Sequence, residues 1–288
     1  MAISARTYIS KSENKMNTSR ILTFLHSGDA GDIVASLATV KEICEYENSK
    51  ALLLLDTSGG TTCNDDELNK IIYGQTKGKG LKFNDKAYDF LVPMIEIQPY
   101  IAKVEKWNSN LQVNIDYNLN KFRKAFVTPE IAKKTNQNLM FLHQNACGLD
   151  FRYNGPWLFY NKQDDDVKHE IIISRSPRVH SAYAFFAIYE DLFKNKAEFI
   201  GLDFEYDLFK ETFRYQPKRY PVKSALDMLR AIANANQIIV NSTLLYWIAV
   251  GYGHQNIIHE MPIDVPTSYF PNQNPATIHY VQGAHFIK

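Results

Sequence analysis

The chain has 288 residues, 45% of them hydrophobic and 22% charged, and its 32 basic and 31 acidic side chains give a net charge of +1 at pH 7. This length is enough for two domains of ordinary size, with cores that need neither disulfides nor a structural metal. The balance of charge argues against a strongly basic nucleic-acid-binding protein. No apolar stretch reaches the roughly 18 residues of a membrane helix.

Residues 1–20 are predicted to be a polar N-terminal extension, because basic residues stand there among Ser, Asn and Glu. This composition lacks the apolar region of a secretory signal. The three cysteines are odd in number and widely spaced, which is not typical of a disulfide framework or a zinc site. We therefore expect a cytoplasmic protein.

After the extension, the chain follows a strand–loop–helix–strand pattern. Ile21–Leu25 predicts a buried strand, the loop 26–32 holds two glycines, and apolar residues at helical spacing predict a helix from about Asp32. Ala51–Leu55 predicts a second buried strand. Fully apolar strands on either side of a helix are typical of a parallel sheet with both faces covered.

The middle of the chain gives weaker patterns. Residues 73–86 are predicted to be an exposed basic loop, and residues 121–134 an exposed basic stretch that is helical or irregular. Phe90–Ile97 is apolar enough to predict another strand. Residues 161–166, Asn-Lys-Gln-Asp-Asp-Asp, are predicted to form a linker, and the three aspartates there are a weak signal for a metal site.

The same alternation of strands and helices returns in the second half. Strands are predicted at Glu170–Ile173, 197–200, Gln237–Val240 and Asn256–His259, and helices at Ala225–Ala235 and from Leu244 to about Val250. Two halves of this kind predict an α/β protein with two Rossmann-like domains. We place them at residues 21–163 and 164–288.

Three strand-to-helix loops are candidates for chemistry, because ligands bind at the carboxyl edge of parallel sheets. In the first, Asp32 begins the predicted helix, where it can serve as a general base or simply cap the helix. Its glycines form only part of the G-x-G-x-x-G pattern, so an NAD-linked oxidoreductase is disfavoured.

The other two loops favour a phosphate-containing ligand. Arg175 and Arg178 follow a buried strand, and guanidinium groups match the geometry of phosphate, although an exposed turn is the plainer explanation. Asn241-Ser242-Thr243 opens a helix and can bind an anion or only cap the helix. If both loops leave neighbouring strands, they face the same edge, so the second half is predicted to hold the ligand.

At these loops the sequence resembles glycosyltransferase family 9, the heptosyltransferase-like group with the GT-B fold. Residues 28–37 (GDAGDIVASL) resemble the family's opening G-x-x-G-D-[VI]-[IL]-x-x-L signature. Residues 229–253 are similar to its ARLIAGAKLFVGNxS…AIAEGLG block, and residues 172–180 to an N-R-[ST]-x-R-[YF]-H variant of small bacterial and phage relatives. The resemblance implies two Rossmann-like domains facing a central cleft.

The resemblance also implies a metal-independent, inverting transfer of a sugar from a nucleotide-diphosphate sugar, with a UDP-sugar expected first, to an acceptor hydroxyl. Asp32 is implied to be the catalytic base. The residues implied to bind the donor are Ser174, Arg175, Arg178, Asn241, Ser242, Thr243 and Glu260. The residues expected at the acceptor are His26, Gly28, Asp29, Gly31, Lys77, Lys79 and Lys82. The family's D-[ST]-G-x-x-H motif is absent at residues 241–245, so heptose is not predicted as the donor sugar.

Two questions stay open at this point. The acceptor is either a cell-surface saccharide or a hydroxymethylated base in phage DNA, whose phosphates the basic stretches 77–86 and 121–134 would contact. The alternative to an enzyme is a non-catalytic nucleotide-binding protein with a degenerate transferase fold, which would bind nucleotide without turnover. No metal site is expected, because the eight histidines lack ligand spacing.

Overall fold

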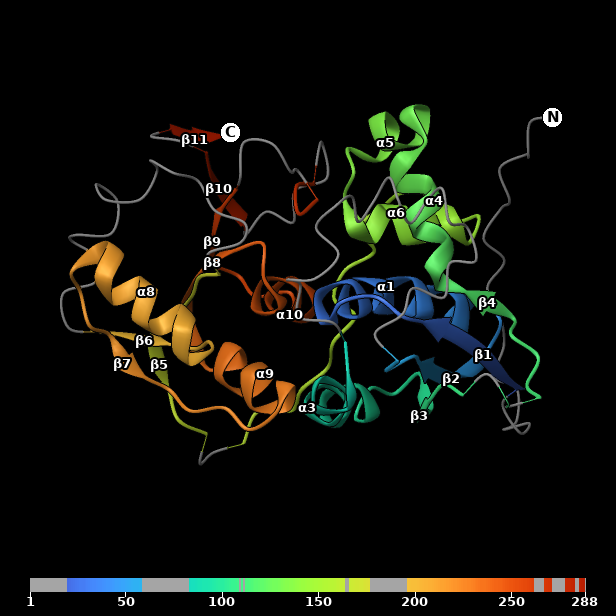
Figure 1. The fold of residues 1–288 in the computed structure, drawn as a ribbon, viewed down its shortest axis with the longest axis horizontal. Helices are drawn as coiled ribbons and strands as arrows, with labels where there is room; N and C mark the ends of the chain where they lie inside the picture. Colours follow the sequence, from blue (N-terminus) through green and yellow to red (C-terminus); the bar gives the residue numbers. More distant parts are fainter. Residues whose placement is uncertain are drawn as a thin grey trace, which may run out of the picture.

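The computed structural model describes residues 20–58, 83–108, 110, 112–163, 166–176, 196–261, 267–270, 278–282 and 285–287. Within these ranges the chain forms two parallel sheets with helices packed against them (Figure 1). Every helix in this part of the chain is too short or too polar to cross a bilayer.

The first sheet has the strand order β3-β2-β1-β4, and all its neighbouring strands are parallel. Its strands are β1 (Arg20–His26), β2 (Ser49–Leu55), β3 (Ile101–Lys106) and β4 (Tyr117–Asn118). The helices of this half are α1 (Ala30–Tyr46), α3 (Asp85–Glu96), the short 3-10 helix η2 (Leu119–Lys121), α4 (Phe122–Val127), α5 (Pro129–Thr135) and α6 (Leu139–Ala146).

The second sheet has the order β11-β10-β9-β8-β5-β6-β7, and only β11 runs antiparallel to its neighbour. Its strands are β5 (His169–Ser174), β6 (Ala197–Phe199), β7 (Lys218–Arg219), β8 (Ala235–Asn241), β9 (Ile257–Glu260), β10 (Ile278–Gln282) and β11 (His285–Ile287). Its helices are α8 (Asp203–Phe213), α9 (Ala225–Ala233) and α10 (Leu244–Tyr252).

The apolar runs predict most of these strands, and one prediction is wrong. The buried strands expected near β1, β2, β5, β6, β8 and β9 are confirmed. Phe90–Ile97, however, lies within and just beyond helix α3 and not in a strand, with Leu91, Met94 and Ile95 buried at helical spacing. Helix α1 begins at Ala30, two residues before the expected start, so Asp32 lies within its first turn.

The two halves share one apolar core, in which α1 packs against α10 and α3 against α9 (Figure 1). Trp157 joins them, since its indole Nε1 donates to the carbonyl of Val34 in α1 at 2.9 Å. The backbone N–H groups of Trp157 and Leu158 both donate to the carbonyl of Gly251 in α10, at 2.8 Å each. These bonds fix α1 relative to α10.

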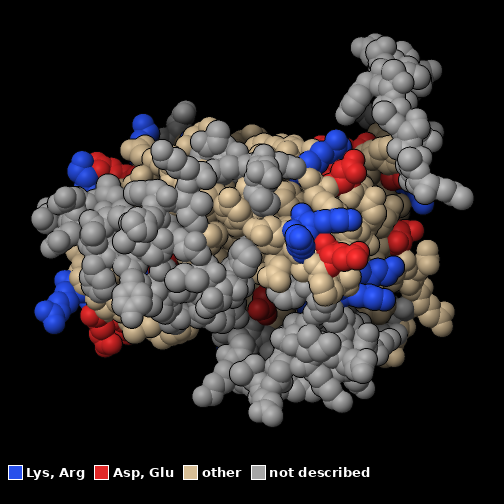
Figure 2. All heavy atoms as spheres, turned by 90° about the horizontal axis from the view of Figure 1, so that it is seen from above, with Lys and Arg blue, Asp and Glu red and all other residues tan. Residues whose placement is uncertain are grey.

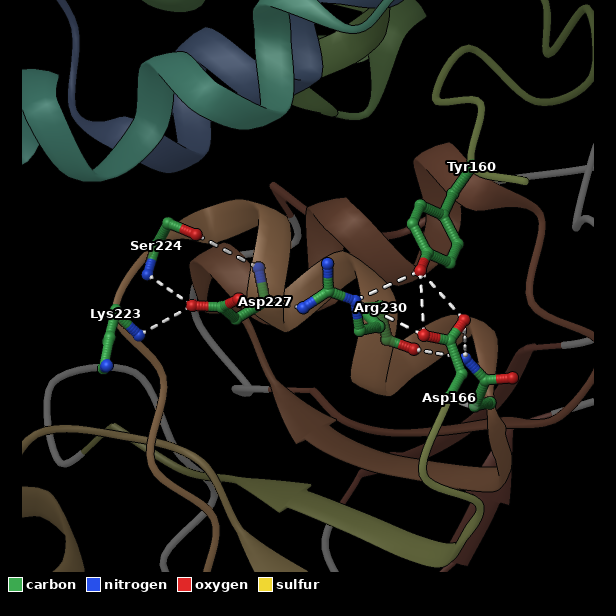
Figure 3. Close-up of polar contacts among 7 residues, drawn as sticks. Tyr160, Asp166, Lys223, Ser224, Asp227 and Arg230 are labelled. Carbon is green, nitrogen blue, oxygen red and sulfur yellow. Dashed lines mark hydrogen bonds and ion pairs between the residues drawn. The ribbon is translucent and has the colours of Figure 1, made fainter. Parts of the chain in front are cut away.

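The described part of the predicted linker is tied to α9 by Asp166 (Figure 3). Its carboxylate accepts from the Tyr160 hydroxyl at 2.8 Å and from Asn234 Nδ2 at 3.1 Å, and pairs with Arg230. Desolvation acts to raise the pKa of Asp166, but the hydrogen bond from the Gln163 N–H, together with those from Tyr160 and Asn234, outweighs it and lowers that pKa. Asp166 thus holds the chain in place, while Asp164 and Asp165 lie outside the described residues.

Candidate active site

The candidate loops follow the carboxyl ends of parallel strands in both sheets. The loop after β1 leads into α1, and the loop after β8 leads into α10. The first turns of these two helices touch, because a Cβ on Gly31 would lie 3.4 Å from Cδ1 of Trp247. The N-terminus of α1, which carries Asp32, therefore lies against the helix that follows Asn241-Ser242-Thr243.

Gly28 gives the first loop its shape. A Cβ at Gly28 would lie 2.5 Å from Cε1 of His26 and 2.9 Å from Oδ2 of Asp32, so only a hydrogen fits there. The Asp32 carboxylate thus lies directly over the Gly28 backbone. It also lies in the first turn of α1, where the helix dipole favours the ionised form.

A pair of buried imidazoles lies beneath this loop. Nδ1 of His26 accepts from the Gly28 N–H at 2.8 Å, and Nε2 of His26 lies 3.0 Å from Nε2 of His143 in α6. Nδ1 of His143 lies 2.7 Å from the Leu139 carbonyl. Burial lowers the pKa of His143 to about 3, and burial with the charges of His143 and Arg123 holds the pKa of His26 well below its usual value. Both rings are therefore neutral at pH 7.

Two side chains from the segment after β4 also form hydrogen bonds with this loop. Asn120 Oδ1 accepts from both the backbone N–H and the hydroxyl of Ser27, at 2.9 and 2.8 Å. Arg123, which is buried, donates to the same oxygen at 2.9 Å and to the Ser27 carbonyl at 3.4 Å. Two sets of hydrogen bonds therefore fix the loop after β1. His26 binds the Gly28 N–H, and Asn120 and Arg123 bind Ser27.

In the second half, two predicted donor residues form an ion pair. Arg175 donates through Nε and Nη2 to the two oxygens of Glu260, at 2.7 and 3.0 Å. The Glu260 side chain is 1% exposed and the Arg175 side chain 10%. With Ser174 and Asn241 they line a shallow hollow at the ends of β5, β8 and β9.

Asn241 joins the two strand ends that the sequence places beside one another. Its Oδ1 accepts from the Ser176 N–H at 3.0 Å, and its Nδ2 donates to the Ser176 carbonyl at 2.7 Å. β5 and β8 are indeed neighbours in the sheet, so these loops leave the same edge. The structure therefore brings Ser174, Arg175, Asn241 and Glu260 together.

Two buried polar atoms near the start of α10 lack a hydrogen-bond partner among the described residues: Oγ1 of Thr243, the residue before the helix, and Nδ1 of His259. His259 lies on β9 with its Nε2 3.3 Å from the Ser242 hydroxyl. Burial lowers the pKa of His259 to about 3, so this ring is neutral as well. The N-terminus of a helix is suited to an anionic ligand, because its backbone N–H groups and its dipole favour negative charge.

The structure does not test every predicted site residue. Arg178, Lys77, Lys79 and Lys82 lie outside the described residues. The sequence analysis missed four residues that shape the site, namely Asn120, Arg123, His143 and His259. They stand in no motif, and only their contacts with the predicted loops single them out. In the described part of the chain, no group of three or more His, Cys, Asp or Glu side chains could hold a metal ion.

No family model and no curated protein matches the chain. Among solved structures, the glycosyl transferase family 9 protein from Veillonella parvula is similar with a TM-score of 0.57 and 13% identity, over 92% of this chain and 87% of that one. The E. coli heptosyltransferase WaaC with ADP is similar with a TM-score of 0.52 and 9% identity, over 91% and 93%. The iron-containing dodecameric glycosyltransferase TibC from enterotoxigenic E. coli has a TM-score of 0.52 and 10% identity, over 92% and 64%. The chain thus has the two-unit α/β fold of these glycosyltransferases.

Proposed function

We propose that this protein is a glycosyltransferase that moves a sugar from a nucleotide-diphosphate sugar to an acceptor hydroxyl. The contact between α1 and α10 supports the proposal, because Gly31, the neighbour of Asp32, lies against Trp247 in the helix that follows the loop 241–243. A carboxylate suited to take a proton and a helix N-terminus suited to hold a diphosphate thus lie on two helices that touch. The shared fold supports this reading.

The reaction is a single displacement. Asp32 takes the proton of the acceptor hydroxyl while its oxygen bonds to the anomeric carbon of the donor sugar. The bond from that carbon to the diphosphate oxygen breaks, and the electron pair leaves with the nucleoside diphosphate, so the anomeric configuration inverts. Backbone N–H groups at the start of α10 offset the charge of the leaving group. Arg175, whose charge Glu260 already balances, contributes N–H donors and not net positive charge, and we propose that no metal ion is needed.

A donor panel tests the proposal. Release of UDP, GDP or ADP from a set of nucleotide sugars, measured by mass spectrometry with and without acceptor, identifies the nucleotide. We expect a UDP-sugar first, and ADP-sugars are the next choice because the similar E. coli heptosyltransferase was solved with ADP. Binding of a nucleotide without turnover across the panel would instead establish the non-catalytic alternative.

Two substitutions separate the base from the donor site. Asp32→Asn is expected to lower kcat by about 10²- to 10⁴-fold, the size of a lost general base, with donor affinity in calorimetry unchanged. Arg175→Ala is expected to weaken donor binding. Near-normal turnover of the Asp32→Asn variant would remove Asp32 from the role of base, and unchanged donor affinity of the Arg175→Ala variant would remove Arg175 from the donor site.

The acceptor that we propose is a saccharide hydroxyl. On the described part of the face in Figure 2, Lys and Arg side chains are interspersed with Asp and Glu. A DNA-binding surface is typically a continuous basic patch. A gel-shift series with duplex DNA at rising salt decides between the two acceptors. Binding that weakens steeply with salt would favour DNA.

A further inference from the structure

The hydrogen bonds beneath the glycine loop assign a role to every nitrogen of the buried imidazole pair, His26 and His143. The Gly28 N–H can only donate, so Nδ1 of His26 carries a lone pair. A neutral His26 then has its proton on Nε2, which faces Nε2 of His143. His143 accepts there and carries its own proton on Nδ1, which donates to the Leu139 carbonyl.

The donors of these hydrogen bonds therefore follow one direction, from the Gly28 N–H through His26 and His143 to the Leu139 carbonyl. His143 sets the ring orientation and tautomer of His26, and His26 in turn holds the Gly28 N–H. The His26 ring and the Asp32 carboxylate both lie close to Gly28, at the point where a Cβ would touch both. A shift of the His26 ring therefore moves the backbone on which Asp32 lies.

We propose that His143, acting through His26, is a positioning residue for Asp32. In this proposal the role of Asp32 depends on the proposed function. The arrangement of the loop does not depend on it. His143 contacts His26 through its Nε2 atom. It lies on α6, 117 positions from His26, and stacks on Phe122 with ring centroids 4.2 Å apart.

The surroundings of the pair favour its neutral form. Arg123 lies close enough to both rings to oppose a second positive charge, and both rings are fully buried. A protonated His26 would turn its Nδ1–H against the Gly28 N–H and break the bond that holds the loop. The arrangement requires both rings to keep one proton each.

Two substitutions of His143 distinguish positioning from general structure. The amide of His143→Gln reaches the place of Nε2 and can still accept from His26, whereas the amide of His143→Asn reaches only the place of Nδ1. With the donor identified by the panel, we expect His143→Asn to lower kcat by about 10- to 100-fold with KM for the donor unchanged. His143→Gln should retain most of the wild-type kcat. Equal kcat in the two variants would overturn the proposal.

Nuclear magnetic resonance tests the arrangement without any substrate. Imidazole ¹⁵N–¹H correlations of the wild type should show His26 as the Nε2–H tautomer and His143 as the Nδ1–H tautomer at pH 7. The Gly28 amide should exchange faster in His143→Asn than in His143→Gln. A cationic ring, a reversed tautomer or equal Gly28 exchange would overturn the proposal. If the wild type shows no transferase activity, the proposed function is rejected. The spectra then still decide the arrangement of the loop.

Discussion

At the scale of single residues, the space around Gly28 explains why the first loop holds a glycine there. Its backbone does not lie in the left-handed region, so conformational freedom is not the reason. The reason is contact, because a Cβ there would lie 2.5 Å from Cε1 of His26 and 2.9 Å from Oδ2 of Asp32. The glycine therefore allows the His26 ring and the Asp32 carboxylate to approach one backbone position.

We predict that Gly28→Ala lowers the free energy of unfolding by about 1–3 kcal/mol, the usual cost of overpacking, and lowers turnover. Its Cβ would lie 2.5 Å from His26 and 2.8 Å from Cβ of Asp32. Gly31→Ala is the matched control for stability, because its Cβ would make an ordinary 3.4 Å contact with Trp247. Urea denaturation measures both, and equal losses in the two variants would contradict this account.

At the scale of elements, α3 shows how an apolar run misleads. Phe90–Ile97 is short enough for a buried strand, and periodicity does not separate a short strand from a buried helix. The structure decides for a helix, which begins after Asn84, whose side chain accepts from the Ala87 N–H. Its buried face then packs against α9 of the other half.

Helix α9 begins with a reciprocal cap, so its first turn gives a local prediction (Figure 3). The Ser224 hydroxyl accepts from the Asp227 N–H at 3.2 Å, and the Asp227 carboxylate accepts from the Ser224 N–H at 3.0 Å. Ser224→Ala is expected to cost about 1 kcal/mol of stability in thermal or urea unfolding. Ser224→Thr keeps the hydroxyl and is expected to cost less, and a loss as large as that of alanine would exclude the cap as the cause.

At the scale of the whole molecule, buried neutral histidines link stability to pH. His143 and His259 have a folded pKa of about 3, below the usual value of 6.5 for an exposed histidine. The unfolded chain therefore binds more protons than the folded one between these values, and stability is lost as pH falls.

We predict that the free energy of unfolding is flat from about pH 6.5 to about 8 and falls as the pH drops to about 4.5, by up to ~1.4 kcal/mol per pH unit for each such histidine. In the described part of the chain, the lowered pKa values of Glu198 and Asp166 place their titration below this window. Urea unfolding at several pH values measures the slope. The His143→Gln variant should show a shallower slope, and an unchanged slope would show that His143 is not one of the groups responsible.

The amino-acid sequence alone determined the strands at the centres of both sheets and the start of α10. Runs such as Ile21–Leu25 and Ala51–Leu55 have no polar face, so they predict strands that helices cover on both sides. Gly253, with a φ of 76°, caps α10 after Tyr252, close to the end expected near Val250. The glycine loop and Asp32 were likewise recognisable, since their pattern is local.

Only the tertiary structure decided which side chains meet at this loop and at the strand ends of the second sheet. His143 lies 117 positions from His26, Asn120 lies 93 positions from Ser27, and Glu260 lies 85 positions from Arg175. None of these pairs leaves a local pattern, because each depends on the order of strands in a sheet and on which loops meet at its edge. The sequence could name the candidate base, but the residues that hold it in place became visible only when the chain was folded.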